Sequence, residues 1–498
     1  MSIKFRKLGI WWVAPLLSIA SFAGTSSDLR LVDAAKNRDR EAVRSLLKQH
    51  VDVNTPQADG ATALAWAAHW DDTETVDLLI RAGANVNAAN SYGVTPLALA
   101  CINQSAAMVE KLLKAGADPN GVPTGTTVLM TAARTGNVDM VKSLLVHGAD
   151  VNAKDNPRGQ TALMWAVAEK HPEVARTLID HGADVHARST SGFTPLLFAA
   201  QQGDMESARM LVEVGANVNE AAPEEGSALV VATHSGHEAL ALFLLEKGAD
   251  SNAADAYGIT ALHYAVLKGL ARVSGVRPIS GADYVYRPNM PELVKALLAH
   301  GANPNARVAK FPPMPNTRQF KLIDLTPVGA TPFLLAAASY DPVIMRLLVA
   351  AGADPSLTDE AKNTPLIMAA GFAEGITHAV LRPEEDDKNA LEAVKIAVEL
   401  GADVNGTNDI GETALHGAAY VGANDIVQFL VEKGAKVDAE NRYGQTAWTI
   451  AAEVMTPGVA KDKDLRPRNS HQNTADLLVK LGAKPLTDPG APVSNVAQ

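Results

Sequence analysis

Few residues in this chain have the type and spacing that enzyme chemistry requires. The sequence contains no Gly-x-Ser-x-Gly elbow, Walker loop, His-Glu-x-x-His motif or dinucleotide fingerprint. Cys101 is the single cysteine, which excludes an internal disulfide and a thiolate zinc site, and we expect it to be a small buried residue. The acidic run 384–387 lacks the alternating ligands of a calcium loop and is interpreted as a solvated charge run. We therefore expect no catalytic residue, no metal and no cofactor.

The histidines fall at positions where a structural role explains them. His147, His181 and His300 each precede a glycine that ends a predicted helix. An imidazole at that place favours the negative end of the helix dipole. His263 and His416 follow Thr-Ala-Leu at predicted helix starts, and we expect them to be hydrogen-bonded structural residues rather than general bases.

Composition and charge narrow the class of protein further. At 498 residues the chain needs either several domains or a repeat array. Apolar residues make up 47% and aromatic residues only 5%, which favours stacked short helices of Ala, Leu and Val over a β-sandwich. The formal net charge is −11, and the sequence has no basic stripe, so nucleic acid is excluded as an expected partner.

The first residues have the pattern of a secretory signal peptide. Three basic residues precede an apolar stretch over 8–20, and Ser21-Phe22-Ala23 places small residues at the cleavage positions. We predict cleavage after Ala23 and a periplasmic or secreted protein with no integral membrane segment. The alternative is a retained membrane anchor, although the apolar run is short for a full span.

A Gly-Ala dipeptide, in most places followed by Asp or Asn, recurs along the chain. The first five intervals between these glycines are 32 to 34 residues long. A period of this length is typical of solenoids, in which each repeat packs on its neighbours. The glycines are Gly83, Gly116, Gly148, Gly182, Gly215, Gly248, Gly301, Gly352, Gly401, Gly434 and Gly482.

A second signature begins with Thr and follows most of these glycines. Thr before Pro or Ala is typical of a helix start, because Thr caps the helix and the next residue needs no donor. A second helix with apolar i, i+3, i+4 spacing follows and is expected to end at the glycine in the left-handed conformation. Each unit is therefore predicted to be a hairpin turn and two antiparallel helices. The threonines are Thr95, Thr161, Thr194, Thr260, Thr331, Thr364 and Thr413.

The two signatures resemble the Thr-Pro-Leu-His-x-Ala-Ala and Gly-Ala-Asp-Val-Asn strings of the ankyrin repeat. His263 and His416 complete the first string. The resemblance covers roughly residues 28–486. It implies an all-α ankyrin-repeat solenoid of about eleven full helix-turn-helix units with β-hairpin-like turns.

The units define the expected domain organisation. After the signal peptide, residues 24–54 lack the leading hairpin and are predicted to be an amino-terminal capping unit, with His50 where the glycine would be. The repeat array is predicted over 55–486, and 487–498 is expected to be a disordered tail.

Four units are 48 to 53 residues long and therefore carry insertions. Insertions in a solenoid form surface loops, where binding function concentrates, and the alternative is that these loops only cover one another. Tyr284, Tyr286 and Arg287 form an aromatic–arginine cluster of the kind enriched in binding hot spots. The second insertion lengthens a hairpin and the others separate two helices; the four lie near 270–290, 308–328, 372–389 and 455–472.

Ankyrin proteins generally bind partners through hairpin tips and the concave side of the first helices, so the resemblance implies candidate contacts at both places. Tyrosine suits a protein interface because it offers contact area with little loss of entropy. At the tips the candidates are Tyr92, Tyr257 and Tyr443, and along the first helices they are Trp70, Arg134, Tyr340 and Tyr420.

The function predicted from these features is a non-catalytic protein–protein interaction scaffold of the cell envelope or exterior. We expect a protein partner and a monomeric chain. One alternative is an enzyme or ligand-binding protein with a site built from the insertions. The other is a cell-envelope structural or carbohydrate-binding protein, which a flat exposed platform of aromatic rings would support.

Overall fold

The computed structural model describes residues 28–122, 125–267, 269–272, 284–287, 290–310, 328–371, 384–454 and 471–485. Over these residues the chain forms 24 α-helices and four short strands. The chain divides into two compact units, one ending at Pro223 and the other beginning at Glu224.

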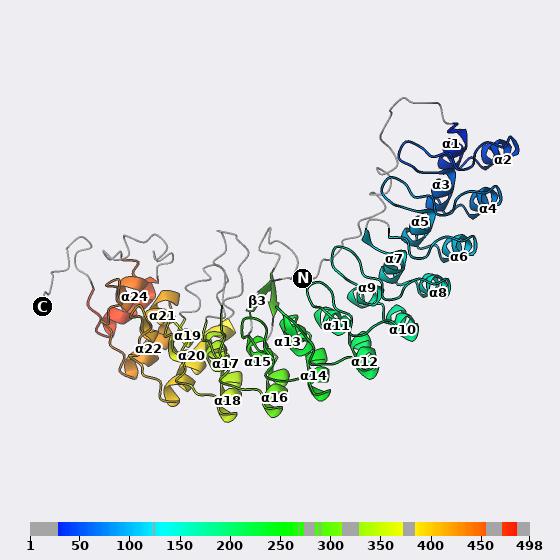
Figure 1. Ribbon diagram of the computed structural model, residues 1–498. Helices are drawn as coiled ribbons and strands as arrows, with labels where there is room; N and C mark the ends of the chain where they lie inside the picture. The colour runs from blue at the N-terminus through cyan, green and yellow to red at the C-terminus, as the bar shows by residue number, and fades with distance from the viewer. Residues whose placement is uncertain are drawn as a thin grey trace. The chain divides into compact units, whose positions relative to one another are not determined.

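In the amino-terminal unit the helices follow one another in antiparallel pairs. The odd-numbered helices pack against each other in chain order and form one layer, and the even-numbered helices form a second (Figure 1). The elements are α1 (Arg30–Lys36), α2 (Arg40–Lys48), α3 (Ala63–His69), α4 (Thr73–Arg81), α5 (Pro96–Ile102), α6 (Ala106–Lys114), α7 (Val128–Thr135), α8 (Val138–Val146), α9 (Ala162–Ala168), α10 (Pro172–Asp180), α11 (Pro195–Gln202), α12 (Met205–Glu213) and strand β1 (Ala221–Ala222).

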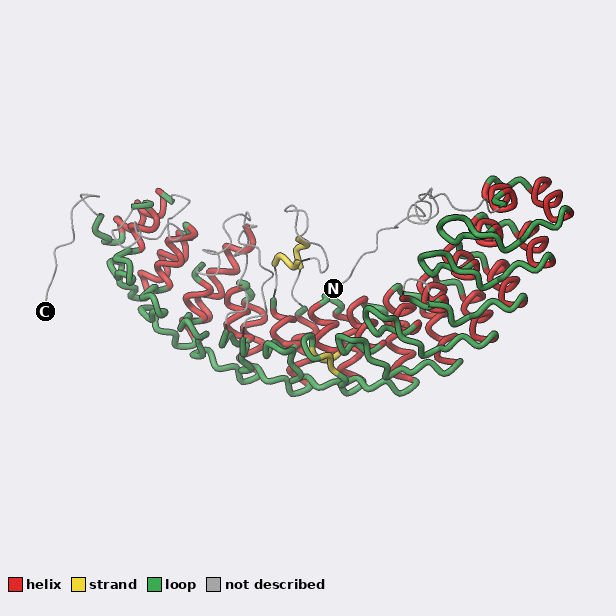
Figure 2. The backbone as a smooth tube through the Cα atoms, turned by 45° about the horizontal axis from the view of Figure 1, so that its top comes forward, coloured by secondary structure: helices red, strands yellow, loops and turns green. Residues whose placement is uncertain are grey.

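The carboxy-terminal unit repeats the same two-layer arrangement. Loops that join one helix pair to the next recur at the same place in each repeat (Figure 2). Its elements are β2 (Gly226–Ser227), α13 (Ala228–His234), α14 (Glu238–Glu246), α15 (Ala261–Val266), β3 (Gly269–Arg272), β4 (Tyr284–Arg287), α16 (Pro291–Ala299), α17 (Pro332–Ala338), α18 (Pro342–Ala350), α19 (Pro365–Ala369), α20 (Glu384–Glu399), α21 (Ala414–Val421), α22 (Asn424–Glu432), α23 (Ala447–Ala451) and α24 (Gln472–Lys480).

Most first helices begin at a threonine, as the sequence predicts. Thr62 Oγ1 accepts a hydrogen bond from Ala65 N at 3.3 Å at the start of α3. Thr331 Oγ1 accepts one from Leu334 N at 3.2 Å at the start of α17. These bonds satisfy backbone donors that have no partner inside the helix.

The second helices end where the sequence places their glycines. At all eleven Gly-Ala positions the glycine has a φ between 81° and 104°, which is the left-handed region that closes a helix. His50 has a φ of 57° after α2. The prediction that His50 stands in the place of this glycine is therefore confirmed.

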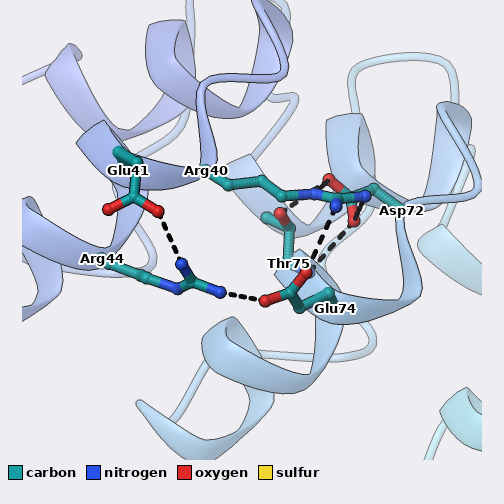
Figure 3. A network of polar contacts seen from close by, with 6 residues as sticks. All are labelled: Arg40, Glu41, Arg44, Asp72, Glu74 and Thr75. Atoms are coloured by element: carbon teal, nitrogen blue, oxygen red, sulfur yellow. Dashed lines mark hydrogen bonds and ion pairs between the residues drawn. The ribbon is translucent and has the colours of Figure 1, made fainter.

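The capping helices are joined to the first full repeat by an ion-pair network (Figure 3). Arg40 pairs with Asp72 at 2.8 Å and with Glu74 at 3.2 Å. Arg44 connects Glu41 and Glu74. Burial opposes ionisation of Asp72, but its hydrogen bonds to Arg40 and Thr75 outweigh burial and lower the pKa of this carboxyl group.

The insertions change the helices beside them. The helices α15, α19 and α23 precede inter-helix insertions and are 5 or 6 residues long, whereas the other first helices have 7 or 8. Strands β3 and β4 pair antiparallel, with Gly269 opposite Arg287. The prediction that 372–389 is an inserted loop is wrong at its end, because α20 already begins at Glu384. The run 384–387 therefore lies on a helix, which extends α20 at its amino-terminal end to 16 residues.

Candidate partner-binding surfaces

Trp70 follows α3 and is held in a fixed orientation while remaining 40% exposed. Its indole Nε1 donates a hydrogen bond to the carbonyl oxygen of Lys36 at 3.0 Å. Its ring lies 6.4 Å from the Trp66 ring at an interplanar angle of 22°. The Arg38 guanidinium lies 5.8 Å from the ring centroid of Trp70. Trp70 is therefore exposed, and its ring also packs on the capping repeat.

The ring beneath Trp70 is buried. Trp66 is 5% exposed, and Lys36 Nζ lies 5.2 Å from its ring centroid. Among the described residues, Trp66 Nε1 and His69 Nδ1 have no hydrogen-bond partner. Burial also lowers the pKa of His69 and so disfavours its charged form. The buried rings at this end of the first-helix layer therefore lie beneath Lys36, Arg38 and Trp70.

The same arrangement recurs farther along the first-helix layer. The exposed guanidinium of Arg134 lies 5.9 Å from the Trp165 ring centroid of the next repeat. In the carboxy-terminal unit, the His234 ring stacks on Tyr264 of the next repeat with a centroid distance of 4.7 Å. In each case the covering side chain lies seven residues after the capping residue of its own first helix. The ring that it covers lies four residues after the capping residue of the next first helix. The fixed offset could have revealed these pairs from the sequence.

Ile102 belongs to the same surface and the sequence did not single it out. It is the last residue of α5, one repeat after Trp70, and is 38% exposed. Helix α5 packs against both α3 and α7. The ends of three successive first helices therefore present Trp70, Ile102 and Arg134.

Tyr92 is the most exposed of the predicted hairpin-tip residues, at 48%. The turn that carries it is fixed by Asn90, whose Oδ1 accepts hydrogen bonds from Tyr92 N at 3.0 Å and Val94 N at 2.9 Å. Ser91 N also donates to the Asp59 carbonyl oxygen of the preceding tip at 2.7 Å. A rigid turn therefore presents this ring.

The other two predicted tip tyrosines are half-buried. Lys310 Nζ lies 5.7 Å from the Tyr257 ring centroid, and the guanidinium of Arg442 lies 5.7 Å from that of Tyr443. Partial burial, followed by the charges of Glu224 and Asp255, raises the pKa of Tyr257. The Tyr257 phenol is therefore neutral at physiological pH.

Two tyrosines predicted on the first-helix face are less accessible than expected. Tyr340 is 5% exposed, so the prediction that it faces a partner is wrong. The sequence placed it on α17, but that helix ends at Ala338 and Tyr340 has a φ of 53°. Tyr340 therefore lies in the turn after α17, and its ring is buried there. Tyr420 lies in α21 and is half-buried.

The predicted cluster of Tyr284, Tyr286 and Arg287 lies in β4. Leu270 is opposite Tyr286 and Arg272 is opposite Tyr284 in the strand pairing. The side chains of these residues are outside the described part of the structure, so the cluster stays a prediction.

The two histidines of the Thr-x-Leu-His string are structural, as predicted. His263 Nδ1 accepts a hydrogen bond from Thr260 N at 3.1 Å, and its Nε2 donates to the Ala306 carbonyl oxygen at 3.1 Å. His416 makes the same bonds with Thr413 N and the Gln445 carbonyl oxygen. Burial lowers the pKa of His263 to about 4, so this imidazole is neutral and joins adjacent repeats.

The histidines at the ends of second helices also have the expected structural place. The ring Nδ1 of each lies 2.7 or 2.8 Å from the carbonyl oxygen four residues earlier. These bonds satisfy carbonyls at the end of the helix. Cys101 is fully buried, and burial raises the pKa of its thiol to about 12. The residues that accept from His147, His181 and His300 are Ser143, Thr177 and Ala296.

Sequence reasoning missed the role of the asparagine that ends the Gly-Ala-Asp-Val-Asn string. Its Nδ2 donates to the carbonyl oxygen of the glycine that ends the second helix of the next repeat. Its Oδ1 accepts a hydrogen bond from the backbone amide of the residue two positions after that glycine. The sequence did carry a signal for this role, because the asparagine recurs four residues after the glycine of most repeats. We call these residues the clamp asparagines; they are Asn54, Asn87, Asn120, Asn152, Asn252, Asn305 and Asn405.

The described residues contain no group of three or more metal-ligating side chains that could hold an ion. No helix in the same part of the chain is long and apolar enough to span a membrane.

Stacked pairs of short helices, each packed on its neighbours, define a solenoid repeat protein. The chain belongs to the ankyrin-repeat family: the family model described as ankyrin repeats (3 copies) matches residues 31–123, 120–189, 196–308 and 384–487, more than half of the chain. Proteins of this family generally mediate protein–protein interactions and are typically non-enzymatic scaffolds.

Solved structures give similar matches. The crystal structure of EF0377, an ankyrin repeat protein, is 30% identical and covers 38% of this chain and 99% of that chain, with a TM-score of 0.36. The crystal structure of the ankyrin repeat domain of Bcl-3, described as a unique member of the IkappaB protein family, is 28% identical. It covers 42% of this chain and 95% of that chain, with a TM-score of 0.39. A search of curated proteins gives no match.

Proposed function

We propose that this chain is a non-catalytic protein-binding scaffold that acts as a monomer in the periplasm or outside the cell. Its partner binds across the ends of α3, α5 and α7, with Trp70 as the main anchor, and contacts Tyr92 at the hairpin tip before α5. The insertions of the carboxy-terminal unit, with Tyr284, Tyr286 and Arg287, form a second contact region.

The orientation of Trp70 carries this proposal. The hydrogen bond to the Lys36 carbonyl oxygen and the contact with Trp66 hold the ring before any partner arrives. A partner that binds it therefore loses little additional entropy in ordering the side chain. Exposed tryptophan and arginine are also the residue types that most often dominate binding energy.

Affinity capture from the envelope fraction of the native organism tests the proposal. Trp70→Ala is compared with wild type and with Val146→Ala, a matched truncation of an apolar residue that is 75% exposed at the end of α8. We expect a protein that wild type and Val146→Ala retain, and roughly thirtyfold weaker binding to Trp70→Ala. Unchanged binding to a folded Trp70→Ala variant contradicts the assigned surface.

Export is supported by the basic residues, apolar stretch and small cleavage residues of the first 23 positions. Amino-terminal sequencing of the protein from its native envelope fraction should begin at Gly24. An intact amino terminus in the membrane fraction indicates a retained anchor instead.

Carbohydrate binding is the nearest competing function, because the Trp66 and Trp70 rings stack. Only one of these rings is exposed, however, so they do not form the flat pair of rings that the carbohydrate alternative requires. Retention of a polysaccharide in place of a protein, with its loss in Trp70→Ala, favours that alternative.

A further inference from the structure

Two of the clamp asparagines are followed by glycine, and these are the two Asn-Gly dipeptides of the sequence. They are Asn120-Gly121 and Asn405-Gly406. Glycine offers no Cβ to block its own amide nitrogen from reaching the asparagine side chain. An asparagine side-chain amide is therefore most open to attack by the next backbone nitrogen when glycine follows it.

The two asparagine side chains are held in the same way. Asn120 Nδ2 donates to the Gly148 carbonyl oxygen at 3.0 Å, and its Oδ1 accepts from Asp150 N at 2.8 Å. Asn405 makes the corresponding bonds with Gly434 and Lys436 at 3.1 and 2.9 Å. An N–H bonded to Oδ1 stabilises negative charge that develops there when the amide carbon is attacked.

The two glycines that follow these asparagines differ in the hydrogen bonding of their backbone amides. Gly406 N donates to the Asp403 carbonyl oxygen at 3.0 Å, and this bond restrains the amide. Gly121 N makes no hydrogen bond within the described residues around it. Asn120 is also exposed, whereas Asn405 is half-buried, so water reaches the first site more easily.

We propose that Asn120 is a site of spontaneous deamidation and that its modification releases the clamp between adjacent repeats. The Gly121 nitrogen attacks Cγ of Asn120, the N–Cγ bond forms, and the Cγ–Nδ2 bond breaks. The proton lost from the Gly121 nitrogen leaves with the departing group as ammonia. Water then opens the cyclic imide at either carbonyl, which yields aspartate or isoaspartate.

The product cannot make the original clamp. A carboxylate has no hydrogen to donate to the Gly148 carbonyl oxygen, and two oxygens then face each other at the former hydrogen-bond distance. Isoaspartate also adds an atom to the backbone path. Modification of Asn120 therefore weakens the contact between the loop after α6 and the loop after α8.

Peptide mapping by mass spectrometry during incubation in mildly alkaline buffer tests the proposal on the full chain. In the folded protein, we expect Asn120 to deamidate about fivefold faster than Asn405, the factor that one neutral hydrogen bond supplies. In denaturant the two rates should converge. Equal rates in the folded protein, or a difference that persists in denaturant, overturns the proposal.

Glycine substitutions provide a second measurement. Gly121→Ala introduces a Cβ only 3.7 Å from the Asp118 carbonyl oxygen, which is ordinary contact, so the fold is retained. This variant should slow deamidation at position 120, because the Cβ hinders attack by the nitrogen of residue 121, while Gly406→Ala leaves the Asn120 rate unchanged. An undiminished rate in Gly121→Ala shows that the Gly121 nitrogen is not the nucleophile.

Discussion

Asn152 joins two repeats through both ends of its side-chain amide. Its Nδ2 donates to the Gly182 carbonyl oxygen at 3.0 Å, and its Oδ1 accepts from Asp184 N at 2.8 Å. Gly182 ends one helix pair and Asn152 follows the previous pair, so the two bonds fix the distance between adjacent loops. An amide is the side-chain group that can donate and accept at this spacing.

Asn152→Ala should lower the free energy of unfolding of the amino-terminal unit by about 1–3 kcal/mol, because two backbone groups lose their partner. Urea unfolding followed by circular dichroism measures the loss. Lys142→Ala, an exposed position on α8, is the control and should change stability little. A loss no larger than that of the control contradicts the clamp.

Gly136→Ala should destabilise the fold more than Gly148→Ala. Both glycines have a left-handed φ, of 76° and 90°. A Cβ at Gly136 would lie 2.7 Å from the His171 ring, whereas nothing lies within 4 Å of one at Gly148. Each substitution incurs about 1 kcal/mol of backbone strain, so the difference in melting temperature isolates the contact with His171. Equal melting temperatures show that His171 moves aside without loss.

Stability of the carboxy-terminal unit should fall as the pH falls from the ordinary histidine pKa of 6.5 to the pKa of His263, which is about 4. Within this range the unfolded chain binds a proton at His263 that the folded chain does not bind. Full titration corresponds to about 3 kcal/mol. His263→Gln keeps an acceptor and a donor without titrating, so the slope of unfolding free energy against pH should decrease. A slope in His263→Gln that equals the wild-type slope contradicts the role assigned to His263.

Cys101 should resist alkylation in the folded chain and react readily after unfolding. Its pKa of about 12 leaves almost no thiolate at neutral pH, and the side chain is fully buried. The rate of iodoacetamide labelling in increasing urea should follow the unfolding of α5. Rapid labelling in native buffer shows that α5 opens without unfolding of its unit.

The sequence predicted the repeat because each element depends on local chemistry. Thr62 caps its own helix and Gly83 ends its own helix, so both are visible in a few adjacent residues. Lys36 and Arg38, which contact Trp70, lie about one repeat away from it, as Gly182 does from Asn152, and these contacts depend on how repeats stack. Tyr340 shows a further limit: its ring is buried after the end of α17, whereas Asp71 at the corresponding position after α3 is exposed.

The shortened helices α15, α19 and α23 alternate with the longer helices α17 and α21. Helices α17 and α21 end seven or eight residues after their capping threonine, whereas α15, α19 and α23 end five or six residues after it. A first helix therefore reaches the seventh residue in only every second repeat of this series. In the amino-terminal unit the first helix reaches this residue in every full repeat. A partner that makes one contact per repeat matches the amino-terminal unit, whereas the series from α15 to α23 presents a pattern with twice that period.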